Sequence, residues 1–320
     1  AAHIHLSVWG YRLYGQVRPA VRSNAMIKII DYKIINDDWT TPSAWGEVTT
    51  GPIKTISGRL ENNMSFNLNS FQLDGRRALI TGSGQGIGLE LARGLGAAGA
   101  TVVINTRTIE KSRAVAGQLR DEGIKAEFLA FDVTDREQLV SAINTFEAAN
   151  GAIDILVNNA GIQRRAALED FSASDWHDVM RTNLDGVFYV SQAVARHMIA
   201  RGRGKIINIC SVQSQLARPS IAPYAASKGA VKMLTKGMCA EWARHGIQAN
   251  GLAPGYFATE MNRALVDNQE FSEWLCKRTP AGRWGRVEEL CGAAVFLASP
   301  ASDFINGQTL FVDGGLTSVV

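Results

Sequence analysis

The sequence predicts an α/β domain in which one parallel β-sheet is covered by helices on both faces, preceded by an N-terminal extension. Beyond residue 71, short apolar segments alternate with segments whose apolar residues recur at helical spacing. A glycine-rich loop follows the first of these apolar segments, at residues 81–88. The 257 residues from Met64 to Val320 are enough for one doubly wound domain with a substantial core.

Seven short apolar segments are predicted to be strands, and helical patterns separate most of them. In parallel sheets of this kind, ligands lie beyond the carboxyl ends of the strands. Most of the motifs of this chain follow such a strand end, so they are expected to meet at one edge of the sheet. The predicted strands are Ala78–Thr81, Ala100–Asn105, Glu127–Asp132, Ile153–Asn158, Gly204–Cys210, Ile247–Ala253 and Thr309–Val312.

The glycine-rich loop Thr81-Gly-Ser-Gly-Gln-Gly-Ile-Gly88 lies between a predicted strand and a predicted helix. At such a junction, free backbone N–H groups and the helix dipole form an anion site, and glycines let a pyrophosphate approach closely. The spacing differs from the common G-x-G-x-x-G dinucleotide fingerprint, and a loop that only turns the chain is the alternative. The predicted contacts to a dinucleotide are Gly82, Ser83, Gln85, Gly86, Ile87 and Gly88.

Tyr224 and Lys228 are four residues apart in a predicted helix, so their side chains share one face. A free tyrosine, with a pKa of about 10, is a poor base at neutral pH. A neighbouring ammonium group is expected to lower that pKa, which permits proton exchange with an alcohol or a carbonyl. Of the six tyrosines, only Tyr224 has a lysine four residues on. An ordinary surface helix with this spacing is the alternative.

These motifs resemble those of the short-chain dehydrogenases/reductases. The resemblance covers residues 71–320 and implies a Rossmann domain with a nicotinamide cofactor. Within the family, three segments are most similar to gluconate 5-dehydrogenases: Leu73–Arg77, Gly161–Arg165 and Lys277–Gly285. The motifs in family order are 81–88, Asp132-Val133, Asn158–Gly161, Asn183, Ser211, Tyr224 with Lys228, Pro254-Gly255 and Val312–Gly315.

The resemblance implies roles for single residues. Tyr224 would exchange the proton, Ser211 would bind the reacting oxygen, and Lys228 would hold the nicotinamide ribose. Asn183 would hold a relay water near Lys228. Asp132 would bind the adenine, although without the resemblance it is equally a helix N-cap ahead of Thr134–Leu139. The remaining implied cofactor contacts are Val133, Asn159, Ala160, Gly161, Pro254, Gly255 and Thr259.

The choice between NAD and NADP is made at the end of the second strand. An NAD site has a carboxylate there for the ribose 2′-hydroxyl, but Thr106 stands at this position and no acid occurs before Glu110. Arg107 follows at once, and its guanidinium suits a 2′-phosphate. NADP is therefore predicted, with NAD possible because Gln85 supplies no second cation; a solvent-exposed Arg107 is the alternative.

The resemblance to gluconate 5-dehydrogenases implies the interconversion of D-gluconate and 5-keto-D-gluconate. A sugar acid needs a cation for its carboxylate, and Arg164 is the first choice, with Arg165 and Arg218 nearby in sequence. Gln213, Ser211 and Tyr224 are further predicted substrate contacts. A 3-oxoacyl-thioester reductase or another sugar or polyol dehydrogenase would use the same catalytic residues. A non-catalytic nucleotide sensor on the same fold is the last alternative. Such proteins commonly lack the tyrosine–lysine pair, so the intact pair argues against this class.

The composition of the chain limits the kinds of partner that it is expected to bind. A net charge of +3 does not indicate nucleic-acid or membrane binding, and no uninterrupted apolar run of about 18 residues occurs. The four cysteines lack metal or disulfide spacing, which predicts reduced thiols and a cytoplasmic protein. The five scattered histidines predict no metal site. The family resemblance implies a homotetramer.

Residues 1–70 are predicted to lie outside the catalytic domain of residues 71–320. They show no sustained periodicity and contain a Thr/Pro/Gly-rich stretch at 40–58, so a loosely packed or disordered extension is expected. The first thirty residues carry four basic side chains and no acidic one, which makes a transit peptide the alternative. Upstream sequence joined to a gene whose natural start is Met64 is the preferred interpretation.

Overall fold

The computed structural model describes residues 2–8, 11–17, 31–36 and 67–320, and the chain divides into two units, residues 1–63 and 64–320. In the first unit, β1 (Ala2–Val8), β2 (Tyr11–Val17) and β3 (Asp31–Asn36) form an antiparallel sheet. These strands were not predicted from the sequence, although in β1 His3, His5 and Ser7 alternate with apolar residues at the period of a strand. The other expectations for residues 1–66 lie outside the described residues.

The second unit is built on a seven-stranded parallel sheet with the order β10-β9-β8-β7-β4-β5-β6. All seven predicted strands are confirmed, and the boundaries shift by a few residues. The largest difference is in β6, which ends at Phe128 rather than at Asp132, so that Asp132 lies in a loop. The strands are β4 (Arg77–Ile80), β5 (Thr101–Ile104), β6 (Ala126–Phe128), β7 (Ile155–Asn158), β8 (Gly204–Ile209), β9 (Ile247–Pro254) and β10 (Thr309–Val312).

Two apolar cores lie on opposite faces of this sheet. Because side chains alternate along a strand, Ala78 and Ile80 of β4 join one core and Leu79 joins the other. Helices α1 (Gly86–Ala97), α2 (Ile109–Asp121) and α9 (Cys291–Ala298) cover the first face. The second face is covered by α3 (Arg136–Asn150), α5 (Gly186–Arg201) and α6 (Ala222–Trp242).

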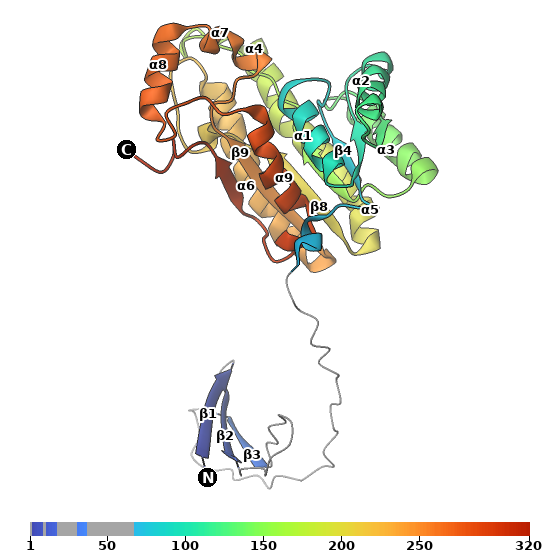
Figure 1. Ribbon diagram of the computed structural model, residues 1–320, viewed down its shortest axis with the longest axis vertical. Helices are drawn as coiled ribbons and strands as arrows, with labels where there is room; N and C mark the ends of the chain where they lie inside the picture. Colours follow the sequence, from blue (N-terminus) through green and yellow to red (C-terminus); the bar gives the residue numbers. More distant parts are fainter. Residues whose placement is uncertain (1, 9–10, 18–30, 37–66) are drawn as a thin grey trace. The chain divides into compact units, whose positions relative to one another are not determined.

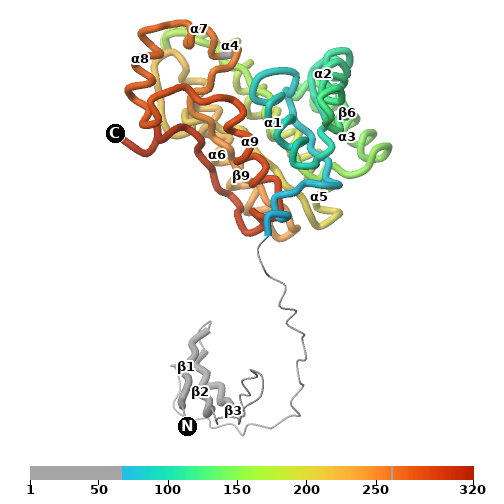
Figure 2. The backbone as a smooth tube through the Cα atoms, in the orientation of Figure 1, coloured from blue at the N-terminus to red at the C-terminus, as the bar shows by residue number. Residues whose placement is uncertain are grey.

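The chain completes one half of the sheet before it begins the other. In Figure 2, β6, α2 and α3 (green) lie on one side, and α6, β9 and α9 (orange to red) lie on the other. The direction of the strand order reverses between β4 and β7. In open parallel sheets, the crevice for a ligand lies at such a reversal, beyond the carboxyl ends of the strands.

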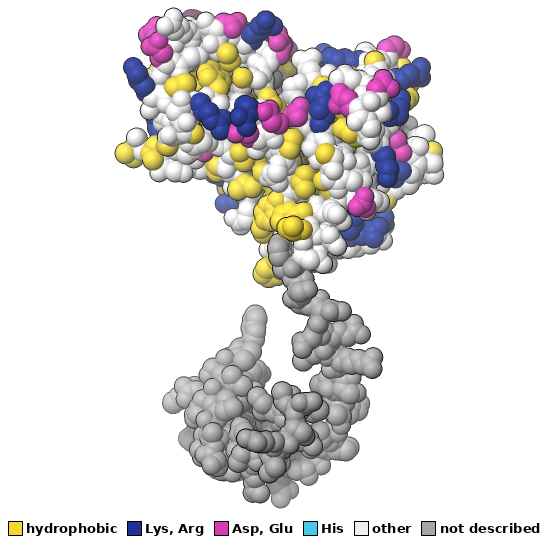
Figure 3. Space-filling view, viewed as in Figure 1, with side chains coloured by type: hydrophobic (Ala, Val, Ile, Leu, Met, Phe, Trp, Pro, Cys, Tyr) yellow, Lys and Arg dark blue, Asp and Glu magenta, His cyan; other side chains and the backbone are white. Residues whose placement is uncertain are grey.

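Three short helices lie at one end of the second unit. Figure 1 shows α4 (Ala173–Met180), α7 (Arg263–Val266) and α8 (Gln269–Arg278) together there. Between α4 and α5 the backbone forms a π-helical turn, Arg181–Asp185. On the face shown in Figure 3, Lys and Arg side chains are interspersed with Asp and Glu side chains. The 3₁₀ turns are Leu68–Phe71, Val212–Ser214, Ala243–His245, Glu260–Asn262, Val287–Leu290 and Pro300–Ser302.

Candidate active site

The glycine-rich loop forms an anion cradle at the start of α1. Helices α2, α3 and α4 each begin with a side chain that caps a backbone N–H group, whereas Gln85, before α1, makes no such bond. The first N–H groups of α1 therefore remain available for a ligand. A Cβ on Gly82 would lie 2.9 Å from Ala160 Cα, and one on Gly88 would lie 2.8 Å from the Gly82 carbonyl oxygen. Only glycine fits at these two close approaches.

A cavity of about 650 Å³ opens over this loop, and we call it the α1 cavity. Most of the predicted cofactor residues line it. Ser83, Pro254 and Gly255 do not belong to its lining. The predicted residues that do are Gly82, Gln85, Gly86, Ile87, Gly88, Arg107, Asp132, Val133, Asn159, Ala160, Gly161, Tyr224, Lys228 and Thr259.

Ser83 and Gly255 differ from the expectation because both face protein. The Ser83 side chain is fully buried; its hydroxyl donates to the Ile80 carbonyl at 2.8 Å and accepts from Asn105 N at 3.0 Å. Ser83 thus ties the loop to the ends of β4 and β5. A Cβ on Gly255 would lie 2.7 Å from Asp313 Cα, so this glycine permits a close packing of two chain segments.

A set of hydrogen bonds beside the α1 cavity joins the glycine loop to the end of β7. The Asn159 amide donates to the Thr81 carbonyl at 2.9 Å and to the Gly82 carbonyl at 3.2 Å. In return, the Thr81 hydroxyl accepts from Asn159 N at 3.0 Å and Ala160 N at 3.1 Å. The two neighbouring strand ends are thereby fixed against each other, as the sheet order places β4 beside β7.

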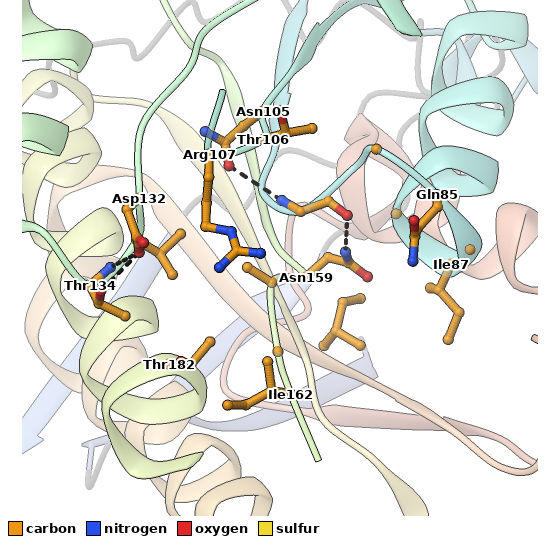
Figure 4. A pocket seen from close by; sticks show the side chains of 18 of the residues that line it. Gln85, Ile87, Asn105, Thr106, Arg107, Asp132, Thr134, Asn159, Ile162 and Thr182 are labelled. Carbon is orange, nitrogen blue, oxygen red and sulfur yellow. Dashed lines mark hydrogen bonds between the residues drawn. The ribbon is translucent and has the colours of Figure 1, made fainter. Parts of the chain in front are cut away.

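Two cations stand at one end of the α1 cavity. Figure 4 shows the Arg107 guanidinium pointing into it between Asp132 and Asn159. Lys111, on the first turn of α2, also lines the cavity, and its Nζ lies 3.3 Å from Gln85 Oε1. Sequence reasoning missed Lys111, and its signal was a basic side chain in the first turn of the helix that follows Arg107. The second cation that the glycine loop lacks comes from α2.

Asp132 is not the N-cap of the following helix. Its carboxylate accepts from the backbone N–H and the hydroxyl of Thr134, both at 2.8 Å. Asp135 caps α3 instead, accepting from Gln138 N at 3.0 Å. The alternative derived from the sequence, that Asp132 is the helix N-cap, was therefore wrong. Asp132 instead lines the α1 cavity in a short turn with Thr134, where it remains open to a ligand.

The lining of the α1 cavity also includes Tyr224 and Lys228, one turn apart on α6. The buried Lys228 ammonium donates to the Ile209 carbonyl at 2.6 Å, and burial lowers its pKa to about 8. Burial raises the pKa of the Tyr224 phenol, and a hydrogen bond with Ser211 opposes that rise. The expected lowering of the Tyr224 pKa by Lys228 is not found, because the ammonium lies 5.8 Å from the ring centroid and is directed at a carbonyl.

Ser211 follows the end of β8 and is held by the turn that it begins. Its hydroxyl oxygen accepts from Gln213 N at 3.1 Å, as the N-cap of a 3₁₀ turn. The side chain is buried beside Tyr224, with which it shares a hydrogen bond. This fixed hydroxyl and the phenol form a pair that can bind one oxygen atom of a substrate.

Asn183 lies in the π-helical turn, fully buried, and its side chain binds protein groups. It accepts from Ile162 N at 2.8 Å and donates to the Ile162 carbonyl at 2.9 Å and to Ser227 Oγ at 3.1 Å. Such π-turns are frequent at functional sites. The asparagine thereby connects the loop after β7 to α6. The contact on α6 is Ser227, whose hydroxyl donates to the Tyr224 carbonyl at 2.7 Å.

The predicted substrate residues separate into two groups. Arg164 lines the α1 cavity but forms an ion pair with Asp175 of α4 at 3.2 Å. Gln213 is buried, and its amide donates to the Tyr256 hydroxyl at 3.3 Å. Tyr256 was not predicted; it lies two residues past β9 and carried no motif that marks it.

A nicotinamide dinucleotide fits the residues of the α1 cavity. The uncapped α1 N-terminus and the glycines suit its pyrophosphate, the two cations suit a phosphate on the adenosine, and Tyr224 with Lys228 lie where the nicotinamide end would be held. Bound there, it supplies the site that accepts or gives a hydride. Among residues 67–320 and the three N-terminal strands, no group of three His, Cys, Asp or Glu side chains is placed to hold a metal ion.

A cavity for a dinucleotide beside a side chain that exchanges protons is the arrangement of a nicotinamide-dependent oxidoreductase. Residues 76–270 match the family described as short chain dehydrogenase. The chain belongs to this family, which confirms the resemblance seen in the sequence.

Relatives with more specific names match nearly their whole length. The gluconate 5-dehydrogenase of Gluconobacter oxydans is 63% identical over 247 residues, 77% of this chain and 96% of the relative. The 5-keto-D-gluconate 5-reductase of Escherichia coli is 57% identical over 250 residues, 78% and 98% of the two chains. A solved gluconate 5-dehydrogenase from Burkholderia cenocepacia, in complex with NADP and tartrate, is 74% identical, with a TM-score of 0.78, and the match covers 79% of this chain and 99% of that one.

Proposed function

We propose that this chain interconverts D-gluconate and 5-keto-D-gluconate with NADP as its cofactor. The observation that carries the proposal is that Arg107 and Lys111 line the same cavity as Tyr224 and Lys228. Arg107 follows β5, whereas Lys228 binds the carbonyl of Ile209 in β8, three places away in the sheet order. A cationic end suits a phosphorylated adenosine, and a proton-exchanging end suits a hydroxyl or a ketone. The likeness to the two named relatives and to the NADP complex supports the sugar acid as substrate.

The proposed proton transfer runs through Tyr224. In the reductive direction, the phenol gives its proton to the C5 carbonyl oxygen while the C5 carbon receives a hydride. In the oxidative direction, the phenolate takes the hydroxyl proton while the hydride leaves C5. The Ser211 hydroxyl donates to the oxygen as negative charge develops on it. Lys228 places a positive charge 5.8 Å from the centre of the Tyr224 ring and is positioned by the Ile209 carbonyl.

The proposal includes the domain assignment and the assembly. Residues 71–320 are the catalytic domain, and residues 1–70 lie outside it, since the relatives align with about 250 residues of this chain. A homotetramer is supported by the large apolar side chains that α5 and α6 expose, Phe188 at 40% and Met233 at 64%. Light scattering after size-exclusion chromatography tests the assembly, and the mass of a single chain would contradict it.

A cytoplasmic location is proposed as well. The four cysteines of the chain, Cys210, Cys239, Cys276 and Cys291, all carry free thiols, as reducing compartments favour. No helix in the described part of the chain is long and apolar enough to cross a membrane. Cell fractionation followed by an assay for the enzyme tests the location, and recovery outside the cytoplasmic fraction would contradict it.

The function is tested by the oxidation of NADPH on addition of 5-keto-D-gluconate to the full chain. We expect turnover with this substrate, and less with NADH in place of NADPH. An acetoacetyl thioester, run in parallel, represents the 3-oxoacyl reductases. Activity with the thioester alone would keep the proton chemistry but overturn the substrate, and no activity with any carbonyl would favour a nucleotide sensor.

A further inference from the structure

The segment that contains α7 and α8 begins and ends on the same short turn, Val312–Gly315, at the end of β10. Where the segment leaves β9, Gly255 N donates to the Val312 carbonyl at 2.9 Å. Where it returns after α8, Ala281 N donates to the Gly314 carbonyl at 3.0 Å. Whatever fixes this turn and the residues after it therefore also fixes both ends of the segment.

Asp313 folds the turn and directs the residues that follow it. Its carboxylate accepts from Gly315 N at 2.9 Å, and from the backbone N–H and the hydroxyl of Thr317 at 2.9 and 2.6 Å. Gly314 and Gly315 have φ values of 63° and 90°, a region of the backbone map that favours glycine. The residues Ser318–Val320 therefore leave the turn in a fixed direction, and Figure 1 shows the C label beside α8.

Arg278, the last residue of α8, binds these residues. Its Nη2 atom donates to the Val319 carbonyl at 3.0 Å. In the part of the chain that the structure describes, Arg278 forms no ion pair with Asp or Glu. Its Nη1 atom is buried without a hydrogen-bond partner. Because a buried donor without a partner costs stability, the stability of the fold alone does not explain this arginine.

Helix α8 contributes to an aromatic cluster on the substrate side of the active site. The Phe271 ring packs against the Tyr256 ring at a centroid distance of 5.7 Å and against the Trp284 ring at 6.3 Å. The Trp284 indole N–H donates to the hydroxyl of Ser272, also on α8, at 3.2 Å. The position of Tyr256 therefore depends on where α8 lies.

This cluster is joined to the reacting groups through Gln213. The Gln213 amide donates to the Tyr256 hydroxyl at 3.3 Å, and the Gln213 backbone N–H donates to the Ser211 hydroxyl at 3.1 Å. A shift of α8 would change the space beside Ser211 in which the substrate must lie, and small misplacements of a reactant slow its reaction. The glycine loop is held by the ends of β4, β5 and β7 instead, so cofactor binding should depend little on α8.

We propose that the contact between Arg278 and Val319 fixes the position of α8. Through Phe271 and Tyr256, α8 then sets the place of the substrate beside the reacting groups. Arg278 is thus a positioning residue, and Ser318–Val320 is the segment through which it acts. This inference rests on the proposed function for its substrate, but the order of α8 can be measured without one.

The test removes the two partners of the contact separately. Arg278→Ala removes the guanidinium, and a chain that ends at Thr317 removes the Val319 carbonyl but keeps the bonds from Thr317 to Asp313. We expect the KM for 5-keto-D-gluconate to rise roughly tenfold in each, because a hydrogen bond from a charged group contributes about that factor. The Kd for NADPH, measured by fluorescence, should stay within about twofold of the full chain. Without ligands, the α8 amides should exchange their hydrogens roughly tenfold faster.

Three further chains sharpen the test. The chain that carries both changes should resemble either change alone within about twofold, because both break the same contact. Arg278→Lys keeps the charge but loses the guanidinium, so its KM should lie between those of the full chain and Arg278→Ala. Lys277→Ala removes the neighbouring exposed cation of α8, and this matched control should behave like the full chain.

Unchanged exchange of the α8 amides in both variants would overturn the proposal, as would effects that multiply in the combined variant. Faster exchange with an unchanged KM would confine the contact to the local stability of α8 and reject its role for the substrate. A matching rise in the Kd for NADPH, or a changed mass of the assembly, would mean a general loss of structure and would also reject it. If the full chain did not reduce 5-keto-D-gluconate, the proposed function would fail, and the exchange of the α8 amides would still decide whether Arg278 and Val319 fix this helix.

Discussion

The side chain of Asn183 binds both backbone polar groups of Ile162. It accepts from the N–H group at 2.8 Å and donates to the carbonyl at 2.9 Å, so the side-chain amide pairs with this backbone in the way that the backbone of a neighbouring strand would. Ile162 lines the α1 cavity directly after Asn159–Gly161. The asparagine therefore fixes the loop that lines the α1 cavity, and it does so from the π-helical turn Arg181–Asp185.

Replacing this asparagine should loosen the cavity. Asn183→Leu leaves the Ile162 N–H and carbonyl without their side-chain partner in a half-buried place, at a cost of roughly 1 to 3 kcal/mol in the free energy of unfolding. The Kd for NADPH should rise roughly tenfold, because the loop is no longer fixed. Urea unfolding and cofactor fluorescence measure the two effects. Asn150→Leu, at the exposed end of α3, is the matched control, and a variant of Asn183 as stable as this control would contradict the role.

The phosphate end of the α1 cavity gives a second prediction. Arg107→Ala and Lys111→Ala should each raise the KM for NADP roughly tenfold and leave the KM for NAD nearly unchanged, since only NADP carries the 2′-phosphate. Initial rates at varied cofactor concentration measure both values. Lys125→Ala removes an exposed cation just before β6, at the amino ends of the strands and away from the α1 cavity, and should change neither. Equal effects on NAD and NADP would show that the two cations contact another part of the cofactor.

The proton donor gives a third prediction. Tyr224→Phe keeps the ring but removes the hydroxyl, so we expect kcat to fall by about three orders of magnitude or more while NADPH still binds. Stopped assays with high enzyme concentration measure the residual rate, and fluorescence titration measures binding. Tyr189→Phe, on α5, should behave like the unmodified chain. Substantial turnover by Tyr224→Phe would remove this residue from its proposed role.

The pKa of Tyr224 predicts how the two directions depend on pH. Burial raises this pKa, so at neutral pH the group is a phenol and is ready to donate its proton to a ketone. Oxidation needs the phenolate, whose fraction grows as the pH rises toward the pKa. The kcat for gluconate oxidation should therefore increase from pH 7 to pH 10, whereas the kcat for ketone reduction should change little, because the phenol remains the main form below its raised pKa. Parallel profiles in both directions would contradict this assignment.

The strands and the order of the motifs could be predicted because they depend on local patterns. Apolar runs identify parallel strands, and glycines identify the turn at Gly82 and Gly88, where no Cβ fits. Side-chain direction was not predictable in the same way. Nothing in the sequence tells that the Ser83 hydroxyl turns inward to Ile80 while Gln85, two residues on, faces the cavity.

The partners of charged residues also depend on distant contacts. Arg164 and Arg165 are neighbours in one motif, yet Arg164 pairs with Asp175 of α4 and Arg165 lies near Arg218. Lys111 is one of several cations on α2, and only the start of that helix at Ile109 places it beside Gln85. Such pairings follow from how loops meet in space, which a single sequence does not encode locally.

Lys228 links the chemistry of the site to the stability of the fold. Burial lowers its pKa from 10.5 to about 8 in the folded protein, so the folded state binds this proton less tightly than the unfolded state. Below pH 8 both states carry the proton, and the cost of burying the charge is fully present. Between pH 8 and 10.5 the folded protein releases the proton first, and its stability rises with pH.

Lys228→Met removes this titration, so the difference between the two proteins isolates it. From pH 7 to pH 9.5, the free energy of unfolding of the unmodified chain should increase by about 2 kcal/mol relative to that of Lys228→Met. Urea unfolding at both pH values measures the four free energies, and all other titrations cancel in the comparison. A difference that stays constant with pH would show that the buried ammonium keeps its ordinary pKa. In that case the Ile209 carbonyl, 2.6 Å away, would be compensating the charge fully.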